Sequence, residues 1–456
     1  MRKRTFVAMG VVATFVAACG GDDGGETGGA ETTAGAATTG SAAVTSAAPA
    51  TTGGADTTGG ADTTGGADTS AGGSDTSAGG SDTSAGGSDT SAGGSDCTLD
   101  EPLRIGYAAD FSELGAFADE PGSAAAQVQV DLLNEEGGVG GQDVEFVVKE
   151  LPEDPSAAQR AAQELLDEGV HAIIGPPFAY NGVPLIDTVA GQVPIISNAS
   201  TDLALADPSR GAFLMSFSDP VQGAAAAEFA TDAGATTAVT FSSPDDPYFT
   251  NTTAAFTDTF TEIGGEVVRD FTFGIADEDF SSQVNELASL DPAPDVLYTA
   301  MVMPATGVLL EQLQAAGIDI QVIGADSFDA TVVWDAGEVA NGVAFTAHTF
   351  PRDDNEVASF IEAASAAGAE IETVSFGALA SDVVKVFAHA AETACSLDGQ
   401  TLIDTISGIS DLEVTTGTVT YEGTNGVPEK DVVILTVDGG EPTFTEAFRP
   451  AYVPGG

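Results

Sequence analysis

Basic residues are scarce in this sequence. Its 456 residues include 12 Lys and Arg against 70 Asp and Glu, which gives a formal net charge of −58. Residues 97–456 alone hold 9 basic and 59 acidic residues. So few cations cannot neutralise the phosphates of a nucleic acid, and the excess negative charge repels an anionic membrane surface. The composition therefore excludes nucleic acid as an expected partner. Acid-rich, Lys-poor surfaces stay soluble at high ionic strength, so we infer a salty habitat.

Groups that hold metals or act as nucleophiles are also few. The three histidines, His171, His348 and His389, lie far apart without metal-ligand spacing, and the three cysteines show no zinc pattern. His171 begins an expected buried strand, where a structural role is favoured. The chain has no GxSxG elbow, no P-loop and no GxGxxG followed by a helix. We therefore expect neither an enzyme nor a bound metal or cofactor.

The N-terminus has the pattern of an export signal. Residues 2–4 are basic, and residues 6–18 form an apolar run that ends at Cys19. This run is too short to span a bilayer as a permanent helix, so we expect an exported protein. The residues VAA before Cys19 make this end resemble a bacterial lipobox, which implies a diacylglycerol on Cys19 and an anchor at the outer face of the cell membrane. A plain signal peptide with a chance cysteine is the alternative.

A low-complexity tract follows the signal. Residues 20–96 lack Lys, Arg, Leu, Ile, Phe, Tyr and Trp, and they repeat TTGGAD three times and TSAGGSD four times. Such a tract cannot bury a core, and its periodic Asp residues repel one another. We interpret it as a disordered tether with a typical end-to-end span of roughly 50 Å, whose Ser and Thr residues are candidate glycan sites.

Two cysteines remain beyond the tether. Cys97 lies at its end, and Cys395 lies at the end of a long helical stretch. An isolated pair in an exported protein favours a disulfide, and two free thiols are the alternative.

Apolar, β-branched runs alternate with helical stretches from residue 103 onward. Strands are expected at 103–108, 144–148, 172–174 and 193–196, with helices at 127–136 and at 154–168, the latter opened by Asp154 and Pro155 as cap and first residue. After 213–217 the alternation restarts and continues to a strand at 342–346. The segments 418–423 and 431–440 are expected to form a closing hairpin or edge pair. About 360 residues exceed one ordinary core, so the pattern predicts an α/β protein with two doubly wound, parallel-sheet lobes.

The strand at 193–196 leads directly into a polar loop, Ser197 to Asp202, and then into LALA, which suits a helix capped by Thr201 or Asp202. Free backbone N–H groups and hydroxyls at such a place bind carboxylate or phosphate. An ordinary strand-to-helix connection is the alternative interpretation.

Nine motifs in order give the chain a family resemblance. They are IGYAADFSELG, NEEGGVGGQDVEFV, VHAIIGPP, VPIISNASTD, AAAAEFA, IGGEVV, DEDFSSQVNEL, PDVLYTA and QLQAAGI. Over 101–450 the chain resembles the branched-chain-amino-acid-binding type of periplasmic binding protein, the substrate-capturing component of an ABC importer. The resemblance implies a clamshell with three crossings between its lobes, lobe 1 at 97–217 plus 349–419 and lobe 2 at 218–348 plus 420–456. Cys97 and Cys395 then both fall in lobe 1.

The resemblance also implies where a ligand binds. In the family, two loops of lobe 1 bind the ligand carboxylate. Here these loops correspond to 197–202, with Ala199 and Thr201 as donors, and to 176–182. In the second loop, Phe178, Ala179 and Tyr180 replace the expected small hydroxyl residue.

Lobe 2 and the first strand supply the other implied contacts. Asp326 matches the family's acidic position for a ligand ammonium, with a loop carboxylate or helix cap as the alternative. Tyr248 matches an aromatic position on the rim. The neighbouring Asp245 and Asp246 are interpreted as solvated charges. Phe117 is a candidate pocket wall or core residue.

One departure puts the standard amino-acid ligand in doubt. Val302 and Met303 stand where the family has a second aromatic residue of lobe 2. The implied function is the capture of an amino acid, or a related small carboxylate or amide, for an ABC permease and ATPase complex. A ligand-binding sensor or surface protein with the same fold, not coupled to transport, is the alternative.

Overall fold

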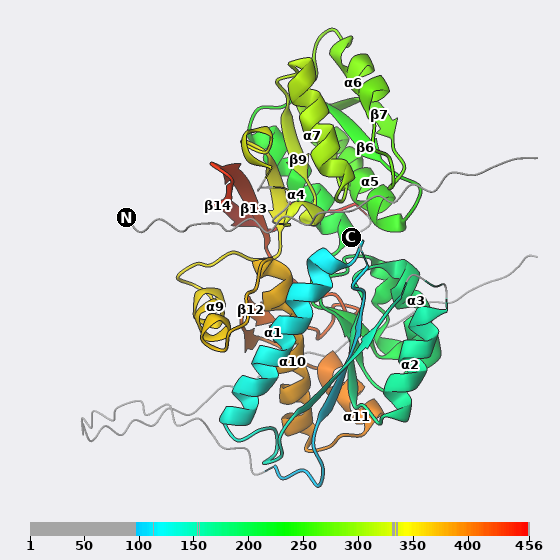
Figure 1. The fold of residues 1–456 in the computed structure, drawn as a ribbon, viewed down its shortest axis with the longest axis vertical. Helices are drawn as coiled ribbons and strands as arrows, with labels where there is room; N and C mark the ends of the chain where they lie inside the picture. Colours follow the sequence, from blue (N-terminus) through cyan, green and yellow to red (C-terminus); the bar gives the residue numbers. More distant parts are fainter. Residues whose placement is uncertain are drawn as a thin grey trace, which may run out of the picture. The chain divides into compact units, whose positions relative to one another are not determined.

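Two β-sheets organise the described part of the chain (Figure 1). The structure is a computed structural model that describes residues 97–454 apart from 113, 153, 155, 331–332 and 334–335. The expected signal peptide, the lipid-bearing Cys19 and the tether at 20–96 lie outside the described residues. All described residues belong to one compact unit, so contacts between the two sheets are part of its structure.

The first sheet has five parallel strands in the order β2-β1-β3-β4-β5. The strands are β1 (Arg104–Ala109), β2 (Glu145–Glu150), β3 (Ala172–Gly175), β4 (Ile195–Ser197) and β5 (Ala212–Leu214). Strands β3, β4 and β5 are buried throughout, as expected for short apolar runs covered on both faces.

Helices cover both faces of this sheet. Tyr107 and Ala109 of β1 pack into one hydrophobic cluster with α1 (Ala116–Glu135), α10 (Val374–Ala394) and α11 (Gly399–Ser407). Ala108 points the other way and packs with α2 (Ala157–Asp167) and α3 (Ala179–Val189). Figure 1 shows α1 beside α10 and α2 beside α3. Successive side chains of a strand face opposite sides, so this alternation is the mark of a doubly wound sheet.

The second sheet has seven strands in the order β14-β13-β10-β9-β8-β6-β7. Its parallel strands are β6 (Thr237–Ser242), β7 (Glu266–Thr272), β8 (Val296–Thr299), β9 (Gln321–Gly324) and β10 (Ala344–Ala347). Helix α4 (Asp219–Asp232) packs against α5 (Pro247–Glu262), and α6 (Ser281–Ala288) packs against α7 (Ala305–Ala316). A short helix, α9 (Val357–Ala366), precedes α10.

The predicted closing hairpin is wrong, because residues 418–423 and 431–440 do not pair with each other. Residues 418–423 contribute to β12 (Gly417–Val419), which pairs with β11 (Leu412–Val414). Strand β13 (Val432–Asp438) pairs antiparallel with β10 and with β14 (Glu441–Phe448). Gly439 and Gly440 have φ values of 67° and 85°. Two central residues with positive φ form the tight turn that suits a two-residue hairpin, so the Gly-Gly pair joins β13 to the strand after it.

Three helix boundaries also differ from the expectation. The loop expected at 176–182 becomes helical at Ala179, where α3 begins. LALA forms only a short 3₁₀ turn, Leu203–Leu205, although Asp202 does cap it. Helix α2 begins at Ala157, because Asp154 accepts a hydrogen bond from Ser156 N–H in a turn before the helix.

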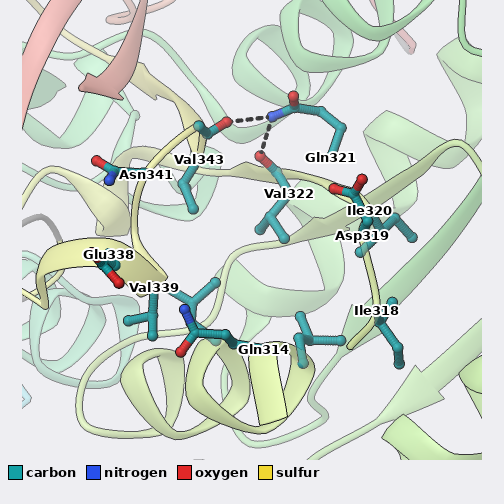
Figure 2. Close-up of a pocket in the computed structure, with 13 residues that line it drawn as sticks. Gln314, Ile318, Asp319, Ile320, Gln321, Val322, Glu338, Val339, Asn341 and Val343 are labelled. Carbon is teal, nitrogen blue, oxygen red and sulfur yellow. Dashed lines mark hydrogen bonds between the residues drawn. The ribbon is translucent and has the colours of Figure 1, made fainter. Parts of the chain in front are cut away.

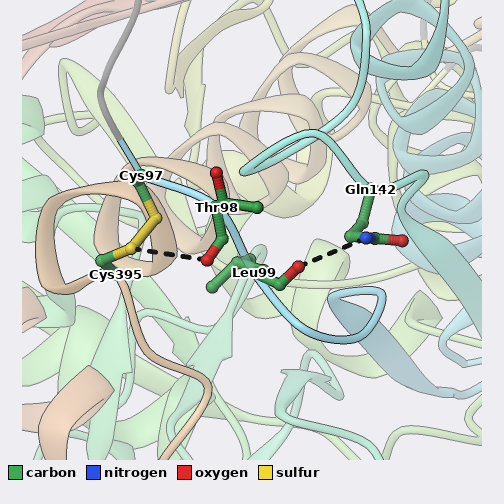
Figure 3. Close-up of a disulfide and its surroundings, with 5 residues drawn as sticks. All are labelled: Cys97, Thr98, Leu99, Gln142 and Cys395. Atoms are coloured by element: carbon green, nitrogen blue, oxygen red, sulfur yellow. Dashed lines mark hydrogen bonds between the residues drawn. A yellow bond between two sulfur atoms is a disulfide. The ribbon is translucent and has the colours of Figure 1, made fainter.

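Cys97 and Cys395 are joined in a disulfide with a Cα–Cα distance of 5.4 Å (Figure 3). Two hydrogen bonds hold the backbone of Leu99. Its N–H donates to Gly140 O at 3.0 Å, and its carbonyl accepts from Gln142 Nε2 at 3.2 Å. The residue at which the described chain begins is therefore tied to the end of α10.

Among the described residues, one helix is long and apolar enough to cross a membrane. It is α10, and 83% of its most apolar window is buried inside the fold. Its side chains fill the core between the first sheet and α1, which accounts for its apolar composition.

Candidate functional site

The loop after β4 is held by its own serines. Ser197 Oγ donates to Pro176 O at 2.9 Å and accepts from Ser200 N–H at 3.0 Å. Among the described residues, no protein group accepts a hydrogen bond from the N–H of Ala199 or of Thr201. Both residues are buried. Buried N–H groups without a partner are rare in proteins, so this loop offers two donors to an anion.

The hydroxyl of Thr201 is already committed to the protein. It donates to the carboxylate of Asp219 and accepts from Gln222 Nε2 at 3.2 Å. Burial, followed by the nearby Asp202 and Asp326 carboxylates, raises the pKa of Asp219 well above its usual value. Thr201 therefore offers its N–H to a ligand, while its hydroxyl links the loop to α4.

Asp326 lies just beyond the carboxyl end of β9 and is 3% exposed. Its carboxylate accepts from Tyr248 Oη at 2.7 Å and lies 2.9 Å from His348 Nε2. Its N–H donates to Gln222 Oε1 at 3.1 Å. The same Gln222 side chain contacts Thr201, so one amide joins the loop after β4 to the acidic residue after β9.

His348 is a site residue that the sequence analysis missed. It follows β10, its ring lies 4.1 Å from that of Phe217 between centroids, and the ring of Phe376 meets it at 5.6 Å. Its Nδ1 is buried without a hydrogen-bond partner. The only sequence signal was a lone histidine directly after an expected strand, and that signal does not distinguish a core residue from a partner of Asp326.

One small cavity collects most of the expected ligand contacts. Loops and helix ends beyond both sheets line it, and the lining residues are Phe117, Pro177, Phe178, Ala199, Thr201, Tyr248, Asp326, Ser327 and Phe376. Its volume is about 20 Å³, which is roughly the room that one water molecule needs. The structure thus brings together six of the eight residues expected at the ligand and adds Ser327 and Phe376.

Aromatic rings form the walls of this cavity. Phe117 meets Phe376 at a centroid distance of 5.3 Å and Phe178 at 6.5 Å, and Phe178 meets Tyr248 edge-on at 6.1 Å. Burial, and then the Asp326 carboxylate, raises the pKa of the Tyr248 hydroxyl, so this group stays protonated and donates to Asp326.

The structure places the other two expected contacts outside the cavity. Ala179 is the first residue of α3 and is buried. Tyr180 is 46% exposed, its hydroxyl donates to Asp110, and its ring stacks on Phe178 at 6.0 Å. Tyr180 lines a separate cavity of about 390 Å³ together with Asp110 and Asn181.

The two neighbouring aspartates of the rim differ from each other. Asp245 is exposed as expected, whereas Asp246 is buried and accepts from Tyr248 N–H at 2.9 Å as the cap of α5. The interpretation of Asp246 as a solvated charge is therefore wrong. Val302 and Met303 pack in the core of the second sheet and do not line the cavity.

A further cavity of about 260 Å³ lies at the other end of the second sheet (Figure 2). Its lining includes Gln321 and Val343, at the amino ends of β9 and β10, and Gln321 Nε2 donates to the carbonyls of Val322 and Gly342. Ligands of open α/β sheets bind beyond the carboxyl ends of the strands, where Asp326 and His348 lie. We therefore place the candidate site at the smaller cavity.

Comparisons with known proteins agree with the fold. The family model described as periplasmic binding protein matches residues 102–441. The Leu/Ile/Val-binding protein BraC3 of Rhizobium johnstonii is 24% identical over 72% of this chain and 89% of its own length. The branched-chain amino acid transporter substrate binding protein LivJ of Streptococcus pneumoniae, solved with isoleucine, has a TM-score of 0.70 at 22% identity and covers 77% of this chain and 100% of its own. The leucine binding protein LivK of Thermotoga maritima has a TM-score of 0.68 at 26% identity and covers 76% and 99%. The chain therefore belongs to the periplasmic binding protein family.

Proposed function

We propose that this protein is an extracytoplasmic substrate-binding lipoprotein that captures an amino acid, or a related small carboxylate or amide, for an ABC importer. The relatives named above are described as binding leucine, isoleucine and valine, which supports the amino-acid class. The importer's permease and ATPase are the expected partners. Delivery to them requires a binding protein that closes on its ligand and then releases it.

The observation that carries this proposal is the pairing of opposite polarities across one cavity. One wall offers the free N–H groups of Ala199 and Thr201, and the other wall offers the carboxylate of Asp326. Donors that lack a partner suit a carboxylate, and a buried acidic group suits an ammonium. The α-carboxylate and α-ammonium of an amino acid supply these two groups on adjacent atoms.

The clamshell division of the chain is part of the proposal. The five strands of the first sheet, together with α10 and the β11–β12 pair, fall within 97–217 plus 349–419. The seven strands of the second sheet fall within 218–348 plus 420–456. The hydrophobic clusters separate in nearly the same way. Phe178 is a buried residue of the first part that packs into the core of the second, and the partly buried Leu114, Phe117 and Phe350 pack against that core.

Ligand entry requires this structure to open. A cavity of about 20 Å³ cannot hold an amino acid. The walls that close it, Phe178 and Tyr248, come from the two proposed lobes and touch each other. Separation of the lobes would part these rings and expose Ala199 and Asp326 together.

A thermal-shift panel on the full chain in concentrated salt tests the proposal. It contains branched-chain, aromatic, basic and acidic amino acids, amides and short carboxylates. A ligand at a hundred times its dissociation constant adds about 2.7 kcal/mol to the free energy of unfolding, which raises Tm by a few degrees. We expect a shift with amino acids. A folded protein with no shift across the panel contradicts amino-acid capture.

Membrane attachment is tested separately at Cys19. The residues VAA before this cysteine support lipidation, and the tether at 20–96 supports a binding domain held away from the membrane. We expect the wild-type protein to sediment with membranes and to incorporate a labelled fatty acid. Cys19→Ser should abolish both, and unchanged sedimentation and labelling of that variant would contradict the anchor.

A further inference from the structure

Four buried carboxylates belong to, or adjoin in sequence or by a hydrogen bond, the residues that line the candidate cavity, and the basic side chains of the chain are engaged elsewhere. Asp202, Asp219, Asp246 and Asp326 are all buried. The nine basic residues of the described chain each pair with an acid outside the cavity lining; these residues are Arg104, Lys149, Arg160, Arg210, Arg269, Arg352, Lys385, Lys430 and Arg449. His348 contacts the carboxylate of Asp326 at 2.9 Å.

Asp202 and Asp246 have no cationic partner, whereas Asp326 faces His348. Asp219 also lacks a cation, but its carboxylate accepts hydrogen bonds from Thr201, Gln222 and Asn251. Asp202 follows the loop of Ala199 and Thr201, and Asp246 caps α5 two residues before Tyr248. Each is 6% exposed. Burial raises the pKa of the Asp246 carboxyl, and the negative charge of Asp202 adds to this rise.

One oxygen of Asp202 is unsatisfied. Its Oδ1 accepts from Ala204 N–H at 2.8 Å, whereas its Oδ2 is buried without a hydrogen-bond partner. A buried carboxylate oxygen with no partner is unfavourable, and a second carboxylate nearby makes it more so. A positive charge placed between Asp202 and Asp246 would relieve both effects.

Two simpler explanations do not account for these groups. An acidic surface keeps a protein soluble in concentrated salt, but that role needs exposed carboxylates, and salt screens buried pairs poorly. A bound metal ion needs more ligands, and the described residues contain no group of three or more His, Cys, Asp or Glu side chains suited to hold one. An organic ammonium or guanidinium needs only one or two carboxylates.

We propose that the ligand is an amino acid with a second cationic group on its side chain, and that Asp202 and Asp246 form the subsite for that group. This assignment rests on the proposed function, in which Ala199, Thr201 and Asp326 take the α-carboxylate and α-ammonium. The aromatic rings of Phe178 and Tyr248 suit the intervening methylene stem, and aromatic faces also attract cations. The substrate class is therefore basic amino acids rather than the branched aliphatic ones.

The test compares lysine with norleucine by calorimetry on the full chain. The two ligands share one carbon skeleton and differ in the terminal ammonium. We expect lysine to bind at least roughly tenfold more tightly, the effect of one buried charge pair. Ornithine against norvaline repeats the comparison with a shorter stem. Titrations with NaCl and with CaCl₂ alone distinguish an inorganic cation from the ligand's own ammonium.

Matched variants locate the subsite. Asp202→Asn and Asp246→Asn remove one charge each, and asparagine preserves the capping hydrogen bonds to Ala204 and Tyr248. Each should lower the preference for lysine over norleucine by roughly tenfold. The control is Asp398→Asn, which removes the same charge from the exposed cap of α11 and should leave the preference unchanged.

The outcomes distinguish a failure of the cationic subsite from a failure of amino-acid capture. Norleucine binding as tightly as lysine overturns the cationic subsite and leaves amino-acid capture standing. A folded protein that binds no amino acid contradicts the proposed function itself. Saturable binding of sodium or calcium that is lost in Asp202→Asn assigns the subsite to an inorganic cation and overturns the proposal. If an asparagine variant does not fold, the ligand comparison on the wild-type chain still decides.

Discussion

Replacement of Asp326 by asparagine separates the charge of the site from its shape. The carboxylate accepts from Tyr248 Oη and lies beside His348 Nε2, and it is almost fully buried. Asparagine keeps an oxygen for the tyrosine and places an amide against the histidine. Alanine would instead leave both partners unsatisfied, at about 1–3 kcal/mol for each buried group. Asp326→Asn is therefore the informative change, because the fold should survive it.

The expected effect on binding is large. Removing one partner of a buried charge pair weakens an interaction by about 2–5 kcal/mol, which corresponds to a loss of affinity of roughly 30-fold or more. The loss should appear for any amino acid whose α-ammonium meets Asp326, whatever its side chain. A ligand without an ammonium, such as a simple carboxylate, should lose far less.

Titration calorimetry of the wild-type chain and Asp326→Asn, with thermal unfolding as the check on folding, measures this effect. Asp270→Asn is the control, because Asp270 belongs to the same sheet, is exposed and hydrogen-bonds to Thr240. The Asp270→Asn variant should bind amino acids with the affinity of the wild-type chain. An Asp326→Asn protein that is folded and binds an amino acid with unchanged affinity would remove Asp326 from the site and refute the reasoning.

Three further predictions concern stability. Burial raises the pKa of Asp329 from 3.8 to about 7; the folded state thus holds a proton that the unfolded chain loses. This proton should contribute a fall of about 3 kcal/mol in the free energy of unfolding between pH 4 and pH 7, and Asp329→Asn should remove that part of the slope in denaturant titrations. Replacing Cys97 and Cys395 by serine opens a link between residues 298 apart and should lower the free energy of unfolding by about 2–5 kcal/mol. Thr201→Val removes one of the donors to the buried Asp219 carboxylate, which also accepts from Asn251. It should lower Tm by several degrees, an effect of about 1–3 kcal/mol; an unchanged Tm would contradict the hydrogen bond's role.

Strands β3 and β4 of the first sheet could be predicted closely because they are short apolar runs buried on both faces. The expected ranges 172–174 and 193–196 overlap β3 and β4 to within two residues. The edge strand of the second sheet was harder to predict from the sequence. Strand β14 reads EPTFTEAF, a polar sequence whose side chains are largely exposed, so only the Gly-Gly turn before it signals a strand.

The candidate site was predictable where backbone geometry creates it. Ala199 and Thr201 are donors because a strand ends there and the loop turns, and that pattern is visible in the sequence. The burial of acidic side chains was not visible. Asp245 and Asp246 are neighbours of the same type, yet one is exposed and the other caps α5 inside the protein. In a chain with 70 acidic residues, residue type alone does not indicate which carboxylates are buried.

The pairing of Asp326 with His348 shows what additional information the sequence analysis needed. His348 follows β10, a strand expected at 342–346, and Asp326 follows β9. The two strands are parallel neighbours, with Ile323 opposite Ala344 and Gly324 opposite Phe345. The carboxyl ends of adjacent parallel strands meet at one edge, so residues shortly after each strand must approach one another. Strand positions could be read from the sequence, but strand order could not, because β10 pairs on its other side with β13 from much later in the chain. Once that order is known, an acid two residues after β9 and a histidine directly after β10 are expected to pair beside the candidate cavity.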